Sequence, residues 1–174
     1  TNKATITIGS LDDVGNSGIS NEGSFINDEN GQINIDRSAS HGIYNTAGTF
    51  TNSANITIGA TESVGAYGIW NQTTFNNVAG QISIDRSTDS GIFNSSGTFT
   101  NSATLTVGGM ASVGDYGIFN DATFNNDGQI NIDNTLISAI HNELGTFDNE
   151  STITIGALVA PLGPNGIYNS GVFM

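Results

Sequence analysis

The chain of 174 residues contains no cysteine. Disulfide bonds, thiolate metal sites and a cysteine nucleophile are therefore excluded. Basic residues are nearly as scarce, because lysine and arginine together number 3 against 16 aspartate and glutamate residues. The three basic residues, Lys3, Arg37 and Arg86, are scattered along the chain. Nucleic acid and anionic membrane surfaces both require clustered positive charge, so we expect neither as a partner.

The chain also lacks long hydrophobic runs and a signal-peptide pattern. No segment approaches the ~20 apolar residues of a membrane-spanning helix, so we expect no membrane span in this segment. The first residue, Thr1, lies inside a predicted coil of the repeat described below, and we expect the chain to be a mature fragment of a longer protein. The formal net charge of −13 favours a soluble, acidic surface.

What the chain has in abundance is a three-part repeat. The first part is Gly-Ile-x-Asn (once Ala-Ile-x-Asn), and it starts at Gly18, Gly42, Gly68, Gly91, Gly117, Ala139 and Gly166. The second part is a phenylalanine seven or eight residues later, at Phe25, Phe50, Phe75, Phe99, Phe124, Phe147 and Phe173. The third part is an aliphatic pair with one residue between, such as Ile33 and Ile35.

Each part of the repeat alternates apolar and polar residues, which predicts a short strand, and Gly, Asn and Ser separate the parts as turns require. The whole pattern recurs every 22 to 27 residues, by subtraction of the positions above. This spacing predicts an all-β parallel β-helix solenoid with three short strands per rung and about seven rungs. Helical repeats fit badly because no segment has a 3.6-residue period. Long rungs with irregular turns favour a right-handed coil.

The repeat also has a longer period of two rungs. Gly18, Gly68, Gly117 and Gly166 are separated by 50, 49 and 49 residues. The short rung contains Gly-Gln-Ile-x-Ile-Asp, and the long rung contains Ile-Thr-Ile-Gly or a variant, followed by an insert with Val-Gly. We therefore predict a single β-helix segment over 1–174, with repeats at approximately 18–67, 68–116 and 117–165 and partial rungs at both ends.

Rungs stacked about 4.8 Å apart place equivalent residues above one another. The asparagines share a strand face with the apolar residues, and a side-chain amide can donate to one neighbour while it accepts from another. One predicted ladder contains Asn21, Asn45, Asn71, Asn94, Asn120, Asn142 and Asn169, and the other contains Asn27, Asn52, Asn77, Asn101, Asn126 and Asn149. A phenylalanine ladder is predicted through Phe25, Phe50, Phe75, Phe99, Phe124 and Phe147. The opening glycine is expected either to adopt a backbone conformation closed to other residues or to admit a close neighbour.

The third residue of Gly-Ile-x-Asn is predicted to point outward, and it is usually aromatic. The candidate interface stripe on consecutive rungs consists of Tyr44, Trp70, Phe93, Phe119, His141 and Tyr168. Three interpretations stay open, namely a self-supporting stack of rings, a protein–protein seam and a surface on which glycans stack.

Asp36, Asp85 and Asp133 end the last strand of each short rung. Carboxylates two rungs apart are about 9.6 Å apart, near the separation in inverting glycosidases, so polysaccharide cleavage is one interpretation. The aspartate repeats identically, however, at a position where a turn needs a capping carboxylate. We therefore favour a structural role and expect no catalytic residue.

Metal and ice binding have weaker signals. The acidic turn at 27–31 offers oxygen ligands, but no calcium-loop spacing is complete, so we expect no cofactor and at most weak calcium binding. His41 and His141 lack metal-ligand spacing. Outward threonines beside the aliphatic strands, such as Thr104 and Thr106, are similar to the faces of ice-binding β-helices, but glutamine and asparagine interrupt them on the short rungs.

The phrase Gly-Ile-Tyr-Asn-x-x-Gly-Thr-Phe-Thr-Asn at 42–52, repeated with Phe for Tyr at 91–101, resembles the repeats of bacterial extracellular parallel β-helix proteins. These include autotransporter passengers, filamentous-haemagglutinin-like adhesins and repeat-built surface appendages. The resemblance implies an extracellular or cell-surface location and a structural or adhesive task.

We accordingly expect a non-enzymatic segment of an extracellular bacterial fibre, appendage or adhesin stalk. Its expected partners are copies of itself, side by side or end to end, and a cell-surface or glycan target. The main alternative is a carbohydrate-active β-helix similar to tailspikes or lyases, and the minor alternative is an ice-binding protein.

Overall fold

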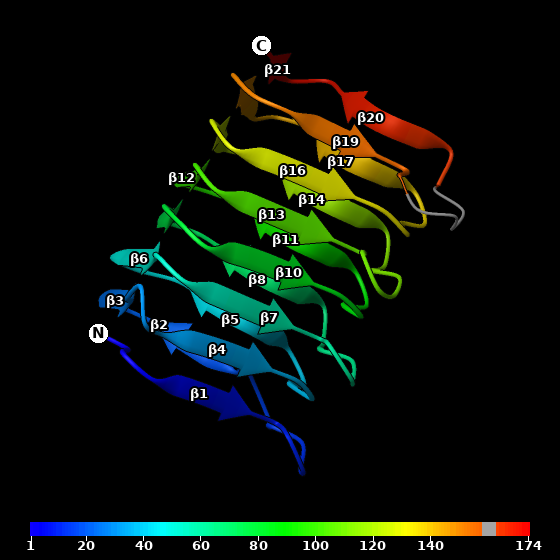
Figure 1. The fold of residues 1–174 in the computed structure, drawn as a ribbon. Coiled ribbons are helices and arrows are strands. Elements are labelled where there is room, and N and C mark those ends of the chain that lie inside the picture. Colours follow the sequence, from blue (N-terminus) through cyan, green and yellow to red (C-terminus); the bar gives the residue numbers. More distant parts are fainter. Residues whose placement is uncertain (158–162) are drawn as a thin grey trace.

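The chain folds into a parallel β-solenoid of about seven turns with three strands per turn (Figure 1). The computed structural model describes residues 1–157 and 163–174, and within these ranges the regular elements are strands and none is a helix. Residues 158–162 of the third predicted repeat lie outside the described residues. The predicted fold class and strand number per rung are confirmed.

Each part of the repeat builds one seven-stranded parallel sheet. The Ile sheet contains β1 (Thr5–Ile8), β4 (Gln32–Ile35), β7 (Asn55–Ile58), β10 (Gln81–Ile84), β13 (Thr104–Val107), β16 (Gln129–Ile132) and β19 (Ile153–Ile155). The Gly-Ile sheet contains β2 (Ile19–Asn21), β5 (His41–Asn45), β8 (Tyr67–Asn71), β11 (Ser90–Asn94), β14 (Tyr116–Asn120), β17 (Ser138–Asn142) and β20 (Asn165–Asn169). The Phe sheet contains β3 (Ser24–Asn27), β6 (Thr49–Asn52), β9 (Thr74–Asn77), β12 (Thr98–Asn101), β15 (Thr123–Asn126), β18 (Thr146–Asn149) and β21 (Val172–Phe173).

The winding sense can be followed in Figure 1. The strands of the Ile sheet in front run from left to right, those of the Gly-Ile sheet behind them run from right to left, and the chain climbs from bottom to top. This is the sense of a right-handed coil, as predicted.

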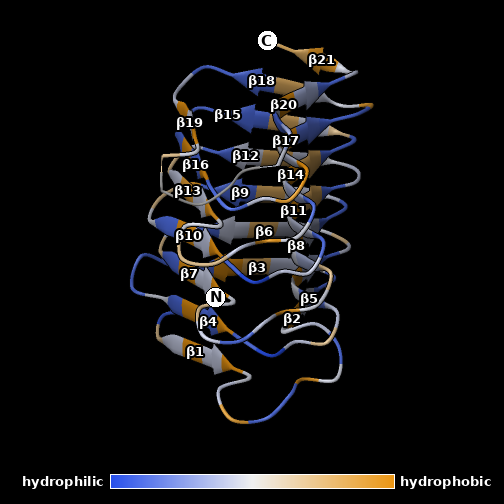
Figure 2. Ribbon diagram, turned by 90° about the vertical axis from the view of Figure 1, so that its right-hand side faces the viewer, coloured by the Kyte–Doolittle hydropathy of each residue, from blue (hydrophilic) through white to orange (hydrophobic). Residues whose placement is uncertain are grey.

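Strand pairing places like residues above like. Ile33 pairs with Ile56 in the Ile sheet, and Phe50 pairs with Phe75 in the Phe sheet. The pairing continues through short and long rungs alike, because the extra residues of the long rung lie in the loop between the Ile sheet and the Gly-Ile sheet. Figure 2 shows these loops facing the viewer, with hydrophobic and hydrophilic segments alternating along the strands beside them.

The phenylalanines form a continuous stack inside the coil. Phe50, Phe75, Phe99, Phe124 and Phe147 are fully buried, and successive ring centroids are 4.7 to 4.8 Å apart with planes within 9°. Full burial of one such side chain stabilises the fold by roughly 1.5–3 kcal/mol. The stack and the aliphatic columns beside it form one apolar core along the whole axis.

Two asparagine ladders run beside this core, as predicted. In each ladder Nδ2 donates to Oδ1 of the asparagine one rung later, at 2.7 to 2.9 Å, from Asn21 to Asn169 and from Asn27 to Asn149. Asn2 donates to Asn27 at 2.9 Å and so begins the second ladder. The repeat pattern did not predict Asn2 as a ladder member. It identifies each asparagine of this ladder by a phenylalanine two residues earlier, and none precedes Asn2.

The ladder amides also hold the corners of the coil. Nδ2 of Asn94 donates both to Asn120 and to the carbonyl oxygen of Thr123, each at 2.8 Å. Thr123 begins β15, the strand of the Phe sheet one rung later, so one side chain joins two sheets and two rungs. Every hydrogen-bonding atom of this fully buried amide is thereby used, since Oδ1 accepts from Asn71.

Glycine is required at two kinds of position for different reasons. Gly59, which follows β7, has a φ of 70°, and a Cβ there would overlap the carbonyl oxygen of Asp85. The opening glycines do not have a positive φ, so the first of the two expected reasons for glycine does not apply to them. At Gly42 a Cβ would instead lie 2.6 Å from the carbonyl oxygen of Gly68 and from Cγ2 of Ile58, which confirms the expected close approach.

Replacing Asn77 by alanine is expected to lower the free energy of unfolding by about 1–3 kcal/mol, because Asn52 and Asn101 would lose their buried partner. The neighbouring Asn76 points outward from the same strand, so Asn76→Ala is a matched control with an expected effect below about 0.5 kcal/mol. Urea unfolding of both variants measures the difference. Equal losses in the two variants would contradict a stabilising ladder.

Candidate functional site: the aromatic face

The predicted stripe of rings lies on the outer side of the Gly-Ile sheet. The structure adds a second column of rings at the beginnings of the same strands, where His41 pairs with Tyr67 and Ser90 pairs with Tyr116. We call the two columns together the aromatic face; it consists of Tyr44, Trp70, Phe93, Phe119, His141, Tyr168, His41, Tyr67 and Tyr116.

The second column was not predicted from the sequence, because inward and outward side chains do not alternate strictly along these strands. A Cβ on Gly42 would point at Ile58 in the core, and the next residue, Ile43, is also fully buried. Two successive inward positions bring His41 to the outer surface, whereas simple alternation from Ile43 would place it inside. The available signal was an aromatic residue directly before the opening glycine, as in Tyr67-Gly68 and Tyr116-Gly117.

Most rings of the stripe lie face to face along the axis. Successive centroids are 4.5 Å apart for Tyr44 and Trp70, 6.0 Å for Trp70 and Phe93, and 5.0 Å for Phe93 and Phe119, with planes within 21°. His141 breaks the pattern, since it meets Phe119 edge-on at 90°. Neighbouring rings therefore cover most ring faces and leave the ring edges outward, and only Tyr168 of the stripe is largely exposed, at 44%.

The polar tips of two rings bind to the rung above. The indole Nε1 of Trp70 donates to Oγ of Ser95 at 2.7 Å, and the hydroxyl of Tyr44 lies 3.3 Å from Oε1 of Gln72. These bonds fix the orientation of the rings. The aromatic face is thus a rigid, pre-organised surface built on strands.

Carboxylates surround one part of the aromatic face. Burial raises the pKa of the Tyr116 hydroxyl, and the carboxylates of Asp115, Asp89 and Glu143 raise it further. Burial also raises the pKa of Asp121, with a further contribution from Glu143. The carboxylates therefore contribute a negative potential at this part of the aromatic face.

The aspartates proposed as a glycosidase pair have structural partners. Oδ1 of Asp85 accepts from the backbone amides of Met110 and Ala111, each at 2.9 Å. Asp36 binds the corresponding turn through the amides of Thr61 and Glu62, each at 3.1 Å. The favoured interpretation of Asp36 and Asp85 as turn caps is confirmed.

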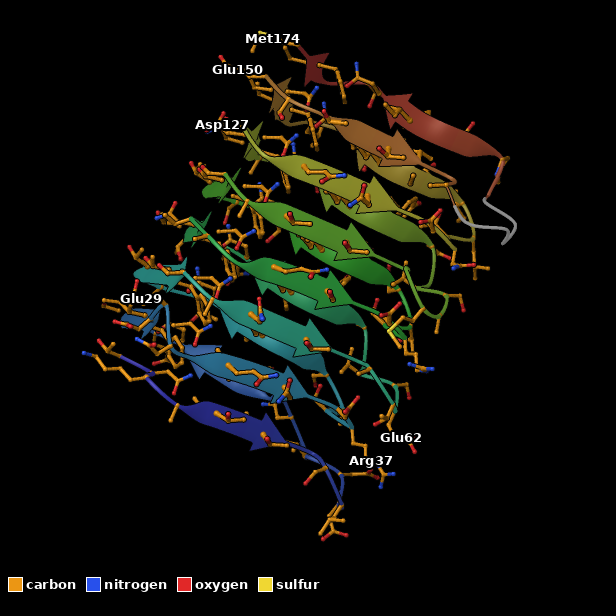
Figure 3. All side chains as sticks on the ribbon, in the orientation of Figure 1. Glu29, Arg37, Glu62, Asp127, Glu150 and Met174 are labelled. Carbon is orange, nitrogen blue, oxygen red and sulfur yellow. The ribbon has the colours of Figure 1, made fainter. Side chains whose placement is uncertain are left out.

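Both arginines serve the turns as well. Arg37 and Arg86 have positive φ angles of 51° and 53°. Arg37 forms an ion pair with Glu62 at 2.8 Å and donates to the carbonyl oxygen of Leu11, also at 2.8 Å. Arg86 donates to the carbonyl oxygen of Gly59 at 2.8 Å. Figure 3 shows Arg37 and Glu62 at the loop side of the coil, away from the broad sheet surfaces.

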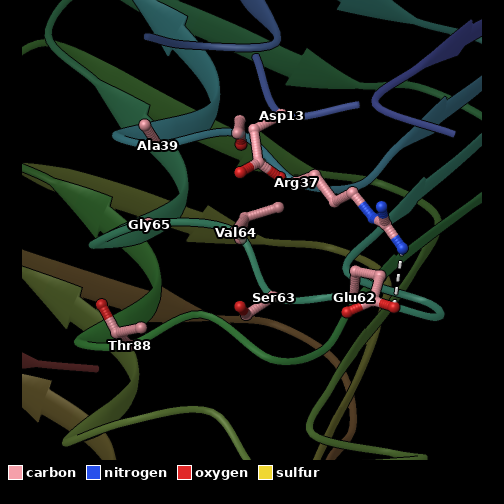
Figure 4. A pocket seen from close by; sticks show the side chains of 9 residues that line it. Asp13, Arg37, Ala39, Glu62, Ser63, Val64, Gly65 and Thr88 are labelled. Atoms are coloured by element: carbon pink, nitrogen blue, oxygen red, sulfur yellow. Dashed lines mark hydrogen bonds and ion pairs between the residues drawn. The ribbon is translucent and has the colours of Figure 1, made fainter. Parts of the chain in front are cut away.

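Two shallow grooves lie beside the loop inserts. The larger, of about 470 Å³, is bordered by the Arg37–Glu62 ion pair and includes Asp13 and Thr88 (Figure 4). The smaller, of about 340 Å³, includes Asp85 and Met110.

Residues 1–157 and 163–174 contain no helix long and apolar enough to cross a membrane. They also contain no cluster of three or more histidine, aspartate or glutamate side chains arranged to hold a metal ion.

Comparisons with protein-family models, with curated proteins and with solved structures find no match to this chain. The class of protein is therefore defined by the fold itself, a parallel β-solenoid with tandem two-rung repeats and asparagine ladders.

The half-buried imidazole of His41 is expected to make stability depend on pH. Burial lowers the folded pKa of His41 below its ordinary value of 6.5. The unfolded chain then binds the proton more readily, so this contribution to stability is complete above pH 6.5 and is lost as the pH falls toward the folded pKa. Thermal unfolding between pH 7.5 and 5 should show a smaller loss in His41→Phe, which keeps a ring in the column. An identical pH profile in both proteins would contradict this role.

Proposed function

We propose that this chain is a rigid, non-enzymatic segment of an extracellular bacterial fibre, appendage or adhesin stalk. The observation that carries the proposal is the unbroken pairing of all three sheets along the axis. Each rung adds about 4.8 Å, so a two-rung repeat lengthens the rod by about 10 Å at constant cross-section. Repeat number then sets the length, which suits a spacer.

The aromatic face supports an adhesive role for the same rod. It is pre-organised by ring stacking, so a partner would bind it at a low cost in conformational entropy. We propose that it contacts copies of the chain side by side or a target on a cell surface. Glycan stacking is less well supported, because sugars stack on ring faces and most of these faces are covered by neighbouring rings.

The resemblance of the repeat phrases to autotransporter passengers and filamentous-haemagglutinin-like adhesins supports an outer-surface location. The absence of cysteine and the acidic composition are compatible with that location. The alternative of a tailspike-like or lyase-like enzyme has less support, because the carboxylates of Asp36 and Asp85 are hydrogen-bonded to turn amides.

An antibody raised against the chain tests the proposed location and shape. We expect it to label intact cells of the source bacterium and to decorate thin rods in negatively stained preparations. Protease treatment of intact cells should remove the signal, and a cytoplasmic protein released by lysis serves as the control. Labelling only after lysis, or release of reducing ends from acidic polysaccharides by the purified chain, would contradict the proposal.

A second candidate function, ice binding, is favoured by one observation on the Phe sheet. The first outward position of five consecutive strands is a threonine, at Thr49, Thr74, Thr98, Thr123 and Thr146. The threonine rows predicted from the sequence were the interrupted ones on the Ile sheet. Here the register aligns the threonines in one uninterrupted column, similar to the faces of ice-binding β-helices.

Thermal hysteresis measurements test this second candidate. If the column binds ice, the double variant Thr74→Tyr with Thr98→Tyr should abolish thermal hysteresis, because bulky rings disrupt a flat array. The matched double variant Thr57→Tyr with Thr106→Tyr, on the Ile sheet, should retain it. Absence of thermal hysteresis in the unmodified chain would remove ice binding from consideration.

A further inference from the structure

Acidic side chains flank the aromatic face on three neighbouring strands. Asp89 immediately precedes β11, Asp115 precedes β14, Asp121 follows β14, and Glu143 follows β17. We call this region the acid-rimmed patch; it consists of the rings Phe93, Tyr116, Phe119 and His141 and the carboxylates Asp89, Asp115, Asp121 and Glu143. The neutral residues Thr46 and Gln72 follow the earlier strands β5 and β8, and a single carboxylate, Glu22, follows β2.

The negative charge of this patch has little compensation within the described chain. Arg37 and Arg86 are bonded to the turns, and Lys3 precedes β1 in the first rung. His141 lies 4.0 Å from Glu143, at the limit of an ion pair. The carboxylate of the half-buried Asp121 accepts a hydrogen bond from the backbone amide of Leu144, while its Oδ1 atom has no partner among the described residues.

The rings of the patch offer apolar contacts between the two acidic borders. Phe93 and Phe119 present ring edges side by side, with centroids 5.0 Å apart. Tyr116 has Ser90 below it and Ser138 above it in its own column, and the rings of Phe119 and His141 contact it from the stripe, with centroids 5.2 and 4.7 Å away. A cation can bind over the face of a tyrosine, and the methylene chains of lysine and arginine pack against ring edges.

We propose that the acid-rimmed patch binds a lysine- and arginine-bearing segment of another protein. The stems of the basic side chains lie across Phe93 and Phe119, and their charged groups donate to Asp89, Asp115, Asp121 and Glu143. Arginine suits this arrangement best, because its planar group both stacks on rings and donates to carboxylates. The inference rests on the proposed adhesive role of the aromatic face and names the chemistry of its partner.

Other occupants fit the patch less well. A second copy of the chain carries the same carboxylates and a net charge of −13, so pairing like patches would oppose like charges. Acidic glycans and nucleic acids are repelled for the same reason. Charge complementarity therefore selects a cationic partner.

Fluorescence anisotropy with a short labelled peptide of alternating arginine and serine tests the proposal at about 150 mM salt. A glutamate–serine peptide is the negative probe. The triple variant Asp89→Asn, Asp121→Asn, Glu143→Gln should weaken binding of the arginine peptide about tenfold or more. The control triple variant Asp12→Asn, Asp13→Asn, Glu29→Gln removes the same charge far from the patch and should weaken it less than about threefold. Circular dichroism verifies that both variants are folded.

Several outcomes would overturn the proposal. Equal weakening by the two triple variants would indicate diffuse attraction to an acidic rod. Absence of binding, or dimerisation of the chain through this patch in sedimentation experiments, would also overturn it. If the peptide does not bind but intact cells are labelled, only the proposal for the acid-rimmed patch is overturned. If the peptide binds but intact cells are not labelled, only the stalk proposal is overturned.

Discussion

The fold depends on one constraint, which is that each buried asparagine must have an identical neighbour in the rung above and the rung below. Asn94 shows the full arrangement, since it accepts from Asn71 and donates to Asn120 and to the carbonyl oxygen of Thr123. Leaving such a group unpaired costs about 1–3 kcal/mol. A rung is therefore stable only within a stack, and the register of one rung dictates the register of the next.

Stacking determines which residues can occupy the interior, whereas the residues at the corners and on the outer faces can differ from one face to another. The corners are closed by glycines with positive φ, such as Gly59, and by the carboxylates of Asp36 and Asp85. The three outer faces differ, because one carries rings, one carries a threonine column, and the Ile sheet carries alternating polar rows. The same rod thus presents distinct chemistries at regular intervals, and both proposed contact surfaces arise from that repetition.

Repetition also explains what the sequence could predict. Period-2 alternation and like-on-like stacking were sufficient for the three sheets, the phenylalanine stack and both ladders, because each depends on residues at a constant offset within the repeat. The outward position of His41 and Tyr67 could not be derived in this way, since Gly42 and Ile43 both face inward and break the alternation. The unpaired Oδ1 of Asp121 required the spatial positions of neighbouring rungs, whereas the threonine column was available in the sequence as the residue directly before each of five phenylalanines.

The most direct test of the account is hydrogen exchange of the asparagine side-chain amides, followed by NMR. The account predicts that the ladder amides, including those of Asn71, Asn94 and Asn101, exchange as slowly as the buried backbone amides of the strands beside them. Amides on outward asparagines such as Asn76 should exchange rapidly. Rapid exchange at Asn71, Asn94 and Asn101 in the folded protein would contradict the stacked ladders on which the structure depends.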